Sequence, residues 1–297
     1  MRNNSGYNLL VSYAYLGKSP SFLDLLIKYV SNGTINLMID SGAFTAYNGR
    51  AERSYINVEE YSQFLHSYAK YSEKYVMLDV VGNAVKSKEN YEQMLAKGLN
   101  PMFVVTMFDN DYDYIRQAVT QNPNICVAGG ATTKSDWMTN RFINVYNETS
   151  GKAKIHGLAY VTFPRMLQLP LKSVDSASWK LSALRFGNIA FFNKGLKSIN
   201  YNDVFKGREK LSEHQIRILH KLGVTVDEFK NLKYYKGNYS IACYSNIYAN
   251  ILMQKYCMDR GLDFFLSISN SQDLKKYIYI ATCKDKSYKD FRNLGGV

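Results

Sequence analysis

The feature that most constrains the fold is an alternation of short apolar segments with longer amphipathic ones, repeated about eight times. Apolar runs without a regular two-residue alternation are typical of strands buried on both faces. Alternating strands and helices favour a parallel sheet, and about eight such units favour an α/β fold of the (β/α)₈ TIM-like barrel type. A doubly wound open sheet is the alternative, although no GxGxxG follows the first strand to support a dinucleotide site. The expected strands are 7–13, 36–39, 75–81, 102–107, 125–128, 154–161, 173–175 and 189–192.

The pattern changes after about residue 205, where apolar residues recur at helical spacing and no further strand is expected. We therefore expect a barrel domain over residues 1–204 and a helical extension over residues 205–297, packed on the barrel. Lys and Arg outnumber Asp and Glu in this extension. It either grips a phosphate backbone or only forms a helical layer that closes the barrel.

The charge of the chain points to a polyanionic partner. Lys and Arg number 37 against 25 Asp and Glu, which gives a net charge of +12. Nucleic acid is the commonest partner of such a basic protein, although lysine-rich surfaces also occur without one. No apolar run is long enough for a membrane span, and the N-terminal stretch lacks the pattern of a signal peptide. We expect no membrane partner.

The cysteines predict neither a metal site nor a disulfide framework. The chain has four, widely scattered, and none forms a CxxC pair. We therefore expect no zinc, no other metal and no cofactor. A reducing cytoplasm fits this cysteine usage, either of a bacterium or of a phage-infected bacterial cell.

Three aspartates, Asp40, Asp79 and Asp175, fall at the carboxyl ends of expected strands, where (β/α)₈ barrels hold their active sites. One such aspartate is about as often a helix N-cap. Three together favour a site, because buried carboxylates need partners. A carboxylate pair can break a glycosidic bond, one member attacking the anomeric carbon while the other moves the proton. A carboxylate also accepts well from a guanine-like edge.

Five short motifs then carry a resemblance to a known family. They are DSGAF at 40–44, LDVVGN at 78–83, VAGGA at 127–131, KIHGLAY at 154–160 and SVDSASW at 173–179. In this order and spacing they resemble the queuine/archaeosine tRNA-guanine transglycosylases, and in particular their compact phage-type relatives that put 7-deazaguanines into DNA. The resemblance covers residues 36 to 180.

The resemblance implies roles for individual residues. Asp175 matches the nucleophile that displaces guanine and leaves a covalent glycosyl-enzyme intermediate, and Asp40 matches the aspartate that assists proton transfer. We expect a set of base-binding residues around them: Phe44 as a stacking ring, Asp79 as a reader of the base edge, Ser41 in the turn, the backbone of Gly129 and Gly130, Thr106 and His156. For His156 the family supplies no role, and a hydrogen-bonded core histidine is the alternative.

The chain also departs from the family pattern. Ala43 stands where the family has a second glycine, and the clustered cysteines of the family's zinc site are absent. The basic tRNA-binding region beside that zinc site is not recognisable either, which favours DNA over tRNA. The family's glutamine before the glycine pair is not evident, and Thr106 or Met107 is the candidate replacement.

Four basic residues are expected to contact the backbone of a nucleic acid, although any of them is also compatible with an ordinary surface cation: Arg50, Lys172, Lys180 and Arg185. The first hypothesis is exchange of guanine for a free 7-deazaguanine base, the second substrate. The second hypothesis is a DNA glycosylase that leaves an abasic site. A non-catalytic nucleic-acid-binding barrel and a barrel enzyme acting on a small sugar or nucleoside are further alternatives. Any target base inside a duplex must first be flipped out.

Overall fold

The structure is a computed structural model, and the chain divides into two compact units. The first unit is Met1–Ser176 with Arg260–Ser269, and the second is Ala177–Asp259 with Asn270–Val297. The first continuous segment of the first unit therefore ends at Ser176, before the expected boundary at residue 204. A later segment, Arg260–Ser269, also belongs to this unit. The structure describes residues 6–47, 56–107, 109–128, 135–231 and 240–283, together with Asp290 and Leu294.

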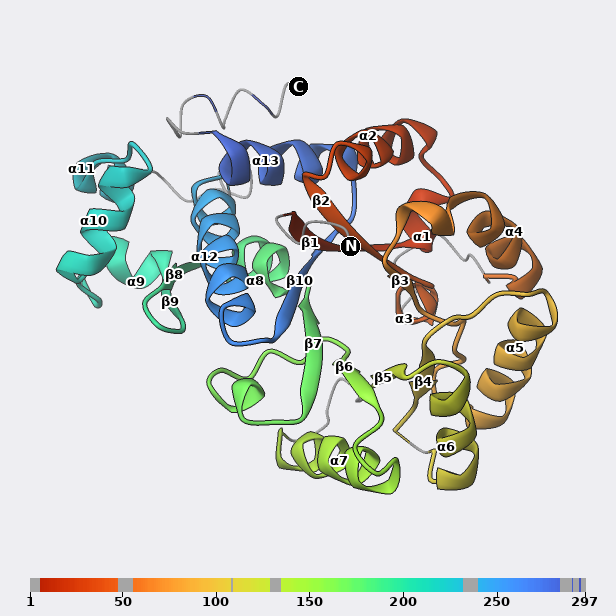
Figure 1. Cartoon of the computed structure of the whole chain (residues 1–297). Coiled ribbons are helices and arrows are strands. Elements are labelled where there is room, and N and C mark those ends of the chain that lie inside the picture. Colours follow the sequence, from red (N-terminus) through yellow and green to blue (C-terminus); the bar gives the residue numbers. More distant parts are fainter. Residues whose placement is uncertain are drawn as a thin grey trace. The chain divides into compact units, whose positions relative to one another are not determined.

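A curved sheet of eight parallel strands forms the centre of the first unit (Figure 1). Its order is β3-β2-β1-β10-β7-β6-β5-β4. A parallel bridge also joins Val76, next to β3, to Met102, next to β4. This confirms a mixed α/β fold with a parallel sheet, which is compatible with a TIM-like architecture. The strands are β1 (Tyr7–Ser12), β2 (Ile35–Asp40), β3 (Lys74–Tyr75), β4 (Phe103–Val105), β5 (Asn124–Val127), β6 (Lys154–Gly157), β7 (Leu171–Ser176) and β10 (Asp263–Ile268).

The strands and helices of this unit form for local reasons that the sequence shows. All three residues of β4 are buried, as expected for a strand covered on both faces. Helix α4 begins after Asn57, whose side chain accepts from the N–H of Glu59, and it buries Tyr61 and Leu65. Helices α2, α4, α5, α6 and α7 lie on the outer side of the curved sheet (Figure 1). The helices of the unit are α1 (Tyr13–Leu16), α2 (Pro20–Ser31), α3 (Ala43–Tyr47), α4 (Val58–Tyr68), α5 (Ala84–Ala96), α6 (Tyr112–Gln121) and α7 (Ser135–Glu148), with short 3₁₀ turns η1 (Ala69–Tyr71) and η2 (Arg165–Leu167).

The eighth strand of the parallel sheet is not the one that the sequence predicts. The segment 189–192 is indeed a strand, β8 (Asn188–Phe192), but it pairs antiparallel with β9 (Leu196–Asn200) in the second unit. The strand that completes the order is β10, inside the segment expected to be helical. It lies between β1 and β7, with Phe265 opposite Asp175. Consecutive elements usually neighbour each other, so a strand that returns after a long helical segment escapes pattern reading.

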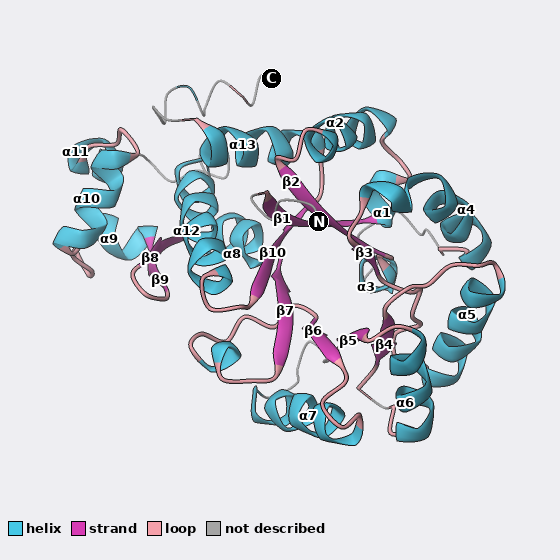
Figure 2. Ribbon diagram, in the orientation of Figure 1, coloured by secondary structure: helices cyan, strands magenta, loops and turns pink. Residues whose placement is uncertain are grey.

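The second unit is mainly helical (Figure 2). Its long helix α12 is tied to α8 and β8 by Asn246, which is 1% exposed. The Asn246 amide donates to the carbonyl of Trp179 at 2.8 Å and accepts from the N–H of Ala190 at 2.6 Å. The helices are α8 (Ser178–Phe186), α9 (Tyr201–Phe205), α10 (Glu213–Lys221), α11 (Val226–Asn231), α12 (Ser240–Met258) and α13 (Ser271–Thr282).

Candidate active site

The three aspartates singled out by the sequence come together at the carboxyl edge of the curved sheet. Asp40 is the last residue of β2, Asp175 lies near the end of β7, and Asp79 follows β3. Burial, and then the nearby carboxylates of Asp79 and Asp175, raise the pKa of Asp40 to about 7. Burial raises the pKa of Asp79 to about 6. Asp40 and Asp79 keep some solvent exposure, so a ligand can reach them. Such shifts mark a candidate site for proton transfer.

Asp40 is fixed by the tight turn that follows β2. Its Oδ2 accepts from the N–H of Gly42 at 3.0 Å, and the side chain of Ser12 on the neighbouring strand also hydrogen-bonds it. Gly42 has a φ of 86°, and a Cβ there would lie 2.4 Å from Oγ of Ser12. A glycine is therefore required for both conformation and space. Ser41 is fully buried in this turn, as a shaping residue would be.

Asp79 is held through its two chain neighbours. The N–H of Val80 donates to Oγ of Ser87 at 2.8 Å, and the amide of Asn90 donates to the carbonyl of Leu78 at 3.0 Å. Both partners belong to α5. Asn83, and not Asp79, is the N-cap of α5. The Asp79 carboxylate is therefore not used as a helix cap.

Asp175 is the most enclosed of the three, at 6% exposure. Its Oδ1 accepts from the N–H of Ala159 at 2.7 Å, and its Oδ2 accepts from the hydroxyl of Ser267 at 3.1 Å. Ala159 has a φ of 52°, an uncommon conformation for a residue with a Cβ. The backbone after β6 is thus shaped to bring an N–H to this carboxylate. The two oxygens are positioned by donors from separate segments, the backbone after β6 and the strand β10.

His156 lies on β6, the strand that pairs with β7, and is completely buried. Its Nδ1 is 2.8 Å from Oγ of Ser173, and its Nε2 is 3.3 Å from Oδ1 of Asp175. Its ring packs edge-to-face with that of Phe265, with the ring centroids 6.2 Å apart. The expected contact of His156 with a base therefore does not fit its position. The ring is completely buried, and its two nitrogens face Ser173 and Asp175.

Thr106 follows β4 and is 5% exposed. Its Oγ1 is buried and has no hydrogen-bond partner among the described residues, so it can still form a hydrogen bond to a ligand.

Arg141 of α7 holds the loop that follows β4 in the sequence. Its guanidinium donates to the carbonyl of Asp109 and to the hydroxyl of Tyr112, the latter at 2.9 Å. The sequence alone does not predict these hydrogen bonds, because Arg141 is one of many basic residues.

Two exposed aromatic side chains belong to α3, the helix that follows Asp40 in the sequence. Phe44 is 53% exposed and Tyr47 is 70% exposed, both on α3. Exposed aromatic rings are side chains on which an unpaired base can stack.

Of the four basic residues expected to contact a nucleic-acid backbone, the structure describes the side chains of Lys172 and Lys180. Lys172 is near the amino end of β7, where its ammonium group lies 3.7 Å from Asp263 and 3.4 Å from the carbonyl of Gly261. It lies at the opposite end of the strand from the carboxyl edge, which does not fit the expected contact. Lys180 belongs to the second unit and forms an ion pair with the buried Asp273 at 2.5 Å. Arg50, Gly129, Gly130 and the side chain of Arg185 lie outside the described residues.

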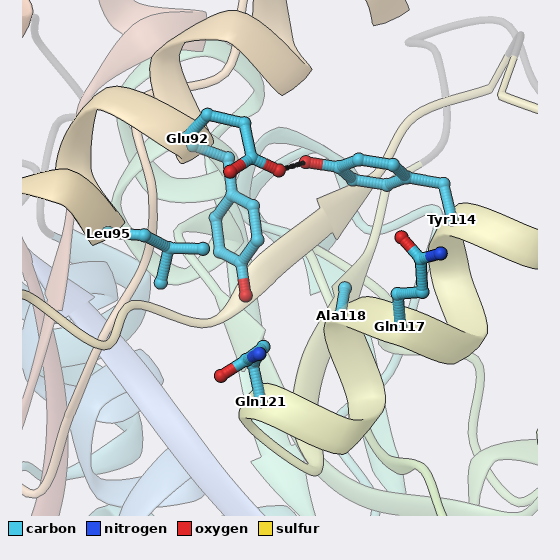
Figure 3. Close-up of a pocket in the computed structure, with 7 residues that line it drawn as sticks. Glu92, Leu95, Tyr114, Gln117, Ala118 and Gln121 are labelled. Atoms are coloured by element: carbon cyan, nitrogen blue, oxygen red, sulfur yellow. Dashed lines mark hydrogen bonds between the residues drawn. The ribbon is translucent and has the colours of Figure 1, made fainter.

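A small cavity lies between α5 and α6, in the outer helical layer (Figure 3). It measures about 110 Å³, and beside it the hydroxyl of Tyr114 donates to Glu92 at 2.5 Å. Gln117 and Gln121 of α6 also line it. This volume suits a few water molecules. None of the three aspartates lines the cavity, so it is not the candidate active site.

Comparison with known proteins gives no relative to carry a function over from. No family model matches the chain, and no curated protein matches it. Among the described helices, none is long and apolar enough to cross a membrane. Within the same described residues, no three His, Cys, Asp or Glu side chains are arranged to hold a metal ion.

Proposed function

We propose that this protein is a nucleic-acid base transglycosylase that exchanges guanine for a 7-deazaguanine base, with DNA favoured over tRNA. The resemblance of its motifs to the tRNA-guanine transglycosylases motivates the proposal. The observation that carries it is the difference between two neighbouring carboxylates. Asp40 has its pKa raised to about 7, whereas Asp175 has both oxygens held by N–H and O–H donors. Neighbouring carboxylates in different environments can divide acid and nucleophile roles between them.

The sheet is proposed to close into a TIM-like barrel. The parallel bridge between Val76 and Met102 supports closure, since it links the segments beside the two edge strands. The N–H of Met102 donates to the carbonyl of Tyr75 at 2.8 Å, and the carbonyl of Met102 accepts from Met77 at 3.0 Å. A barrel of this type gathers catalytic residues at the carboxyl ends of several strands.

In the first half of the proposed reaction, a carboxylate oxygen of Asp175 bonds to C1′ of the nucleotide while the glycosidic C–N bond breaks. The electron pair of that bond stays on the departing guanine, and protonated Asp40 gives the base a proton. In the second half, Asp40 takes the proton from a ring nitrogen of the incoming deazaguanine. That nitrogen bonds to C1′, and the electron pair of the ester bond returns to Asp175.

Asp79, Thr106 and Phe44 are proposed to hold the base. The Asp79 carboxylate accepts from N–H groups on a guanine-like edge, and the Thr106 hydroxyl supplies a further hydrogen bond. Phe44 stacks on the ring, and the neighbouring Tyr47 stacks on an adjacent unpaired base. The exposure of both aromatic side chains, on the helix that follows Asp40 in the sequence, supports a substrate whose bases are unstacked.

A second candidate is a glycosylase, in which water attacks the same covalent intermediate and leaves an abasic site. The partial solvent exposure of Asp40 and Asp79 favours it, since exchange requires water to be kept from the intermediate.

The test is intact mass spectrometry of the protein after incubation with single-stranded DNA, duplex DNA and tRNA, followed by nucleoside analysis of each nucleic acid. Wild type should form a covalent adduct and incorporate a supplied 7-deazaguanine. Asp175→Ala should form no adduct, with activity lower by on the order of 10³-fold or more. Asp263→Asn, at the amino end of the same sheet, is the matched control and should react like wild type.

The alternatives predict different products. Abasic sites without incorporation would establish the glycosylase instead. Binding without either product would leave a non-catalytic nucleic-acid-binding protein, and full activity in Asp175→Ala would remove Asp175 as the nucleophile.

A further inference from the structure

We propose that His156 is a positioning residue for Asp175, holding Oδ1 by an Nε2–H donor so that Oδ2 faces the reacting carbon. The inference rests on the proposed function, because it assigns a reacting oxygen to the proposed nucleophile. His156 itself does not touch the substrate, since it is completely buried.

The Nε2 atom of His156 lies next to one acceptor, Oδ1 of Asp175. The Nε2 atom is buried and has no hydrogen-bond partner of good geometry among the described residues. The Oδ1 atom of Asp175 lies 3.3 Å from it. Buried polar atoms are nearly always satisfied in native proteins, and catalytic hydrogen bonds often tighten only when substrate binds. The Nε2–H is therefore the donor, and Oδ1 is its acceptor.

The other ring nitrogen is consistent with this tautomer. Nδ1 is 2.8 Å from Oγ of Ser173, and a serine hydroxyl can donate to it. Ser173 and Asp175 are two residues apart on β7, so their side chains share one face of the strand. A neutral imidazole that accepts from Ser173 and donates to Asp175 uses both nitrogens.

The two oxygens of Asp175 then have different surroundings. Oδ1 faces two N–H donors, from Ala159 and from His156, whereas Oδ2 accepts from the hydroxyl of Ser267. Ser267 can swing aside because a hydroxyl rotates freely, while the backbone N–H of Ala159 cannot. The structure thus assigns Oδ2 as the oxygen that bonds to C1′.

The donor on Oδ1 affects the two half-reactions unequally. It stabilises the carboxylate anion more strongly than the ester, because charge-assisted hydrogen bonds are the stronger ones. It therefore helps Asp175 to leave when the incoming base nitrogen bonds to C1′ and the C1′–Oδ2 bond breaks. Loss of this donor slows the second half more than the first, and the covalent intermediate accumulates.

Two substitutions separate the two contacts of the ring. In His156→Gln the amide group reaches the position of Nε2 and can still donate to Asp175. In His156→Asn the shorter side chain reaches only the position of Nδ1, near Ser173. Both variants are polar and buried, so comparison of their thermal unfolding controls for effects on folding.

We expect His156→Asn to lower base exchange on single-stranded DNA by about 10- to 100-fold and to raise the fraction of covalent adduct, while His156→Gln stays within about threefold of wild type. Equal loss in both variants, or loss without accumulation of adduct in His156→Asn, overturns the inference. If wild type itself gives no adduct and no exchange, the proposed function fails.

A measurement without substrate keeps the inference testable in that case and if either variant does not fold. In ¹⁵N-histidine NMR of the full chain, we expect His156 as the neutral tautomer protonated at Nε2. Asp175→Asn should shift the Nε2 signal. A His156 ring protonated at Nδ1 alone, or a signal that Asp175→Asn leaves unchanged, overturns it.

Discussion

At the amino ends of the strands, the ammonium group of Lys172 lies 3.7 Å from the carboxylate of Asp263, whereas at the carboxyl ends two carboxylates have no such counter-charge. Among the described residues, neither Asp40 nor Asp79 forms an ion pair, and the other two carboxylates further raise the pKa of Asp40. Lys74, at the start of β3, has its pKa lowered by burial, while Asp263 acts against that shift. The same sheet therefore balances charge at one end and leaves it unbalanced at the other.

This difference separates stability from function. The Lys172–Asp263 pair at the amino ends links the neighbouring strands β7 and β10 and needs no ligand. Unpaired, partly buried carboxylates cost free energy in the folded protein, and such a cost is typical of a site that awaits a ligand or a proton. In (β/α)₈ barrel enzymes, residues at the carboxyl ends of the strands likewise serve catalysis and those at the amino ends serve stability.

The largest effect on this comparison is expected from Asp40→Asn. It removes the group proposed to protonate the departing base and should slow adduct formation by about 10²- to 10⁴-fold. In wild type the rate of adduct formation should fall as the pH rises through about 7, because the acid form of Asp40 is then lost. Single-turnover adduct formation, followed from acid to alkaline pH, measures both.

The matched variant is Asp263→Asn, which should keep the wild-type rate and its dependence on pH. A fall in rate near pH 7 that persists in Asp40→Asn would assign that titration to another group.

The next effect compares the two ends of one strand, β2. Gly33 before it and Gly42 after it have φ values of 77° and 86°, but a Cβ at Gly33 meets no atom within 4 Å. Gly33→Ala should cost about 1–2 kcal/mol of unfolding free energy for its backbone conformation. Gly42→Ala should cost about 1–3 kcal/mol more through its clash with Ser12, and should impair adduct formation by moving Asp40. Urea denaturation midpoints and the mass assay check this, and equal costs would show that the turn relaxes freely.

The smallest effect concerns stability against pH. The folded pKa of Asp40 is about 7 against an ordinary 3.8, so the stability contributed by its protonated form is fully present below about pH 4 and lost as the pH rises through 7. Asp40→Asn should therefore be more stable than wild type at pH 8, by on the order of 1–2 kcal/mol after allowance for its partial exposure, and equal near pH 4.

Asp263→Asn should change stability in the opposite direction at pH 8, by about 1 kcal/mol or less, because it loses an exposed ion pair. Thermal unfolding at the two pH values measures each difference. A wild type that is the more stable at pH 8 would contradict the unbalanced charge at Asp40.

Seven strands of the parallel sheet and the three aspartates at carboxyl ends could be predicted from the sequence. An apolar run, and an aspartate that directly follows one, are local patterns. The partners of Asp175 could not be. The donor of Ala159 is a backbone N–H, and Ser267 is an ordinary serine on β10, a strand separated from β7 by the whole of α8 to α12. Neither carries a local signal, so only the fold brings them to the carboxylate.

Lys172 shows the limit of proximity in sequence. It lies three residues before Asp175, and this nearness suggested a shared site. A strand rises about 3.3 Å per residue, so Lys172 lies roughly 10 Å away along β7, toward the other end of the sheet. Two residues that are close in the sequence can therefore lie at opposite ends of a strand and serve different functions.

The return of β10 to the centre of the sheet has a consequence for synthesis on the ribosome. Strands β1 and β7 each pair with β10, so each keeps one open edge until residues 263–268 have emerged. At translation rates of about 5–20 residues per second, β1 waits on the order of tens of seconds for this partner. An open strand edge can pair with another chain, so aggregation competes with folding during this interval. Asp175 gains its Ser267 partner in the same step, and the growing chain therefore cannot assemble its proposed active site until β10 has emerged.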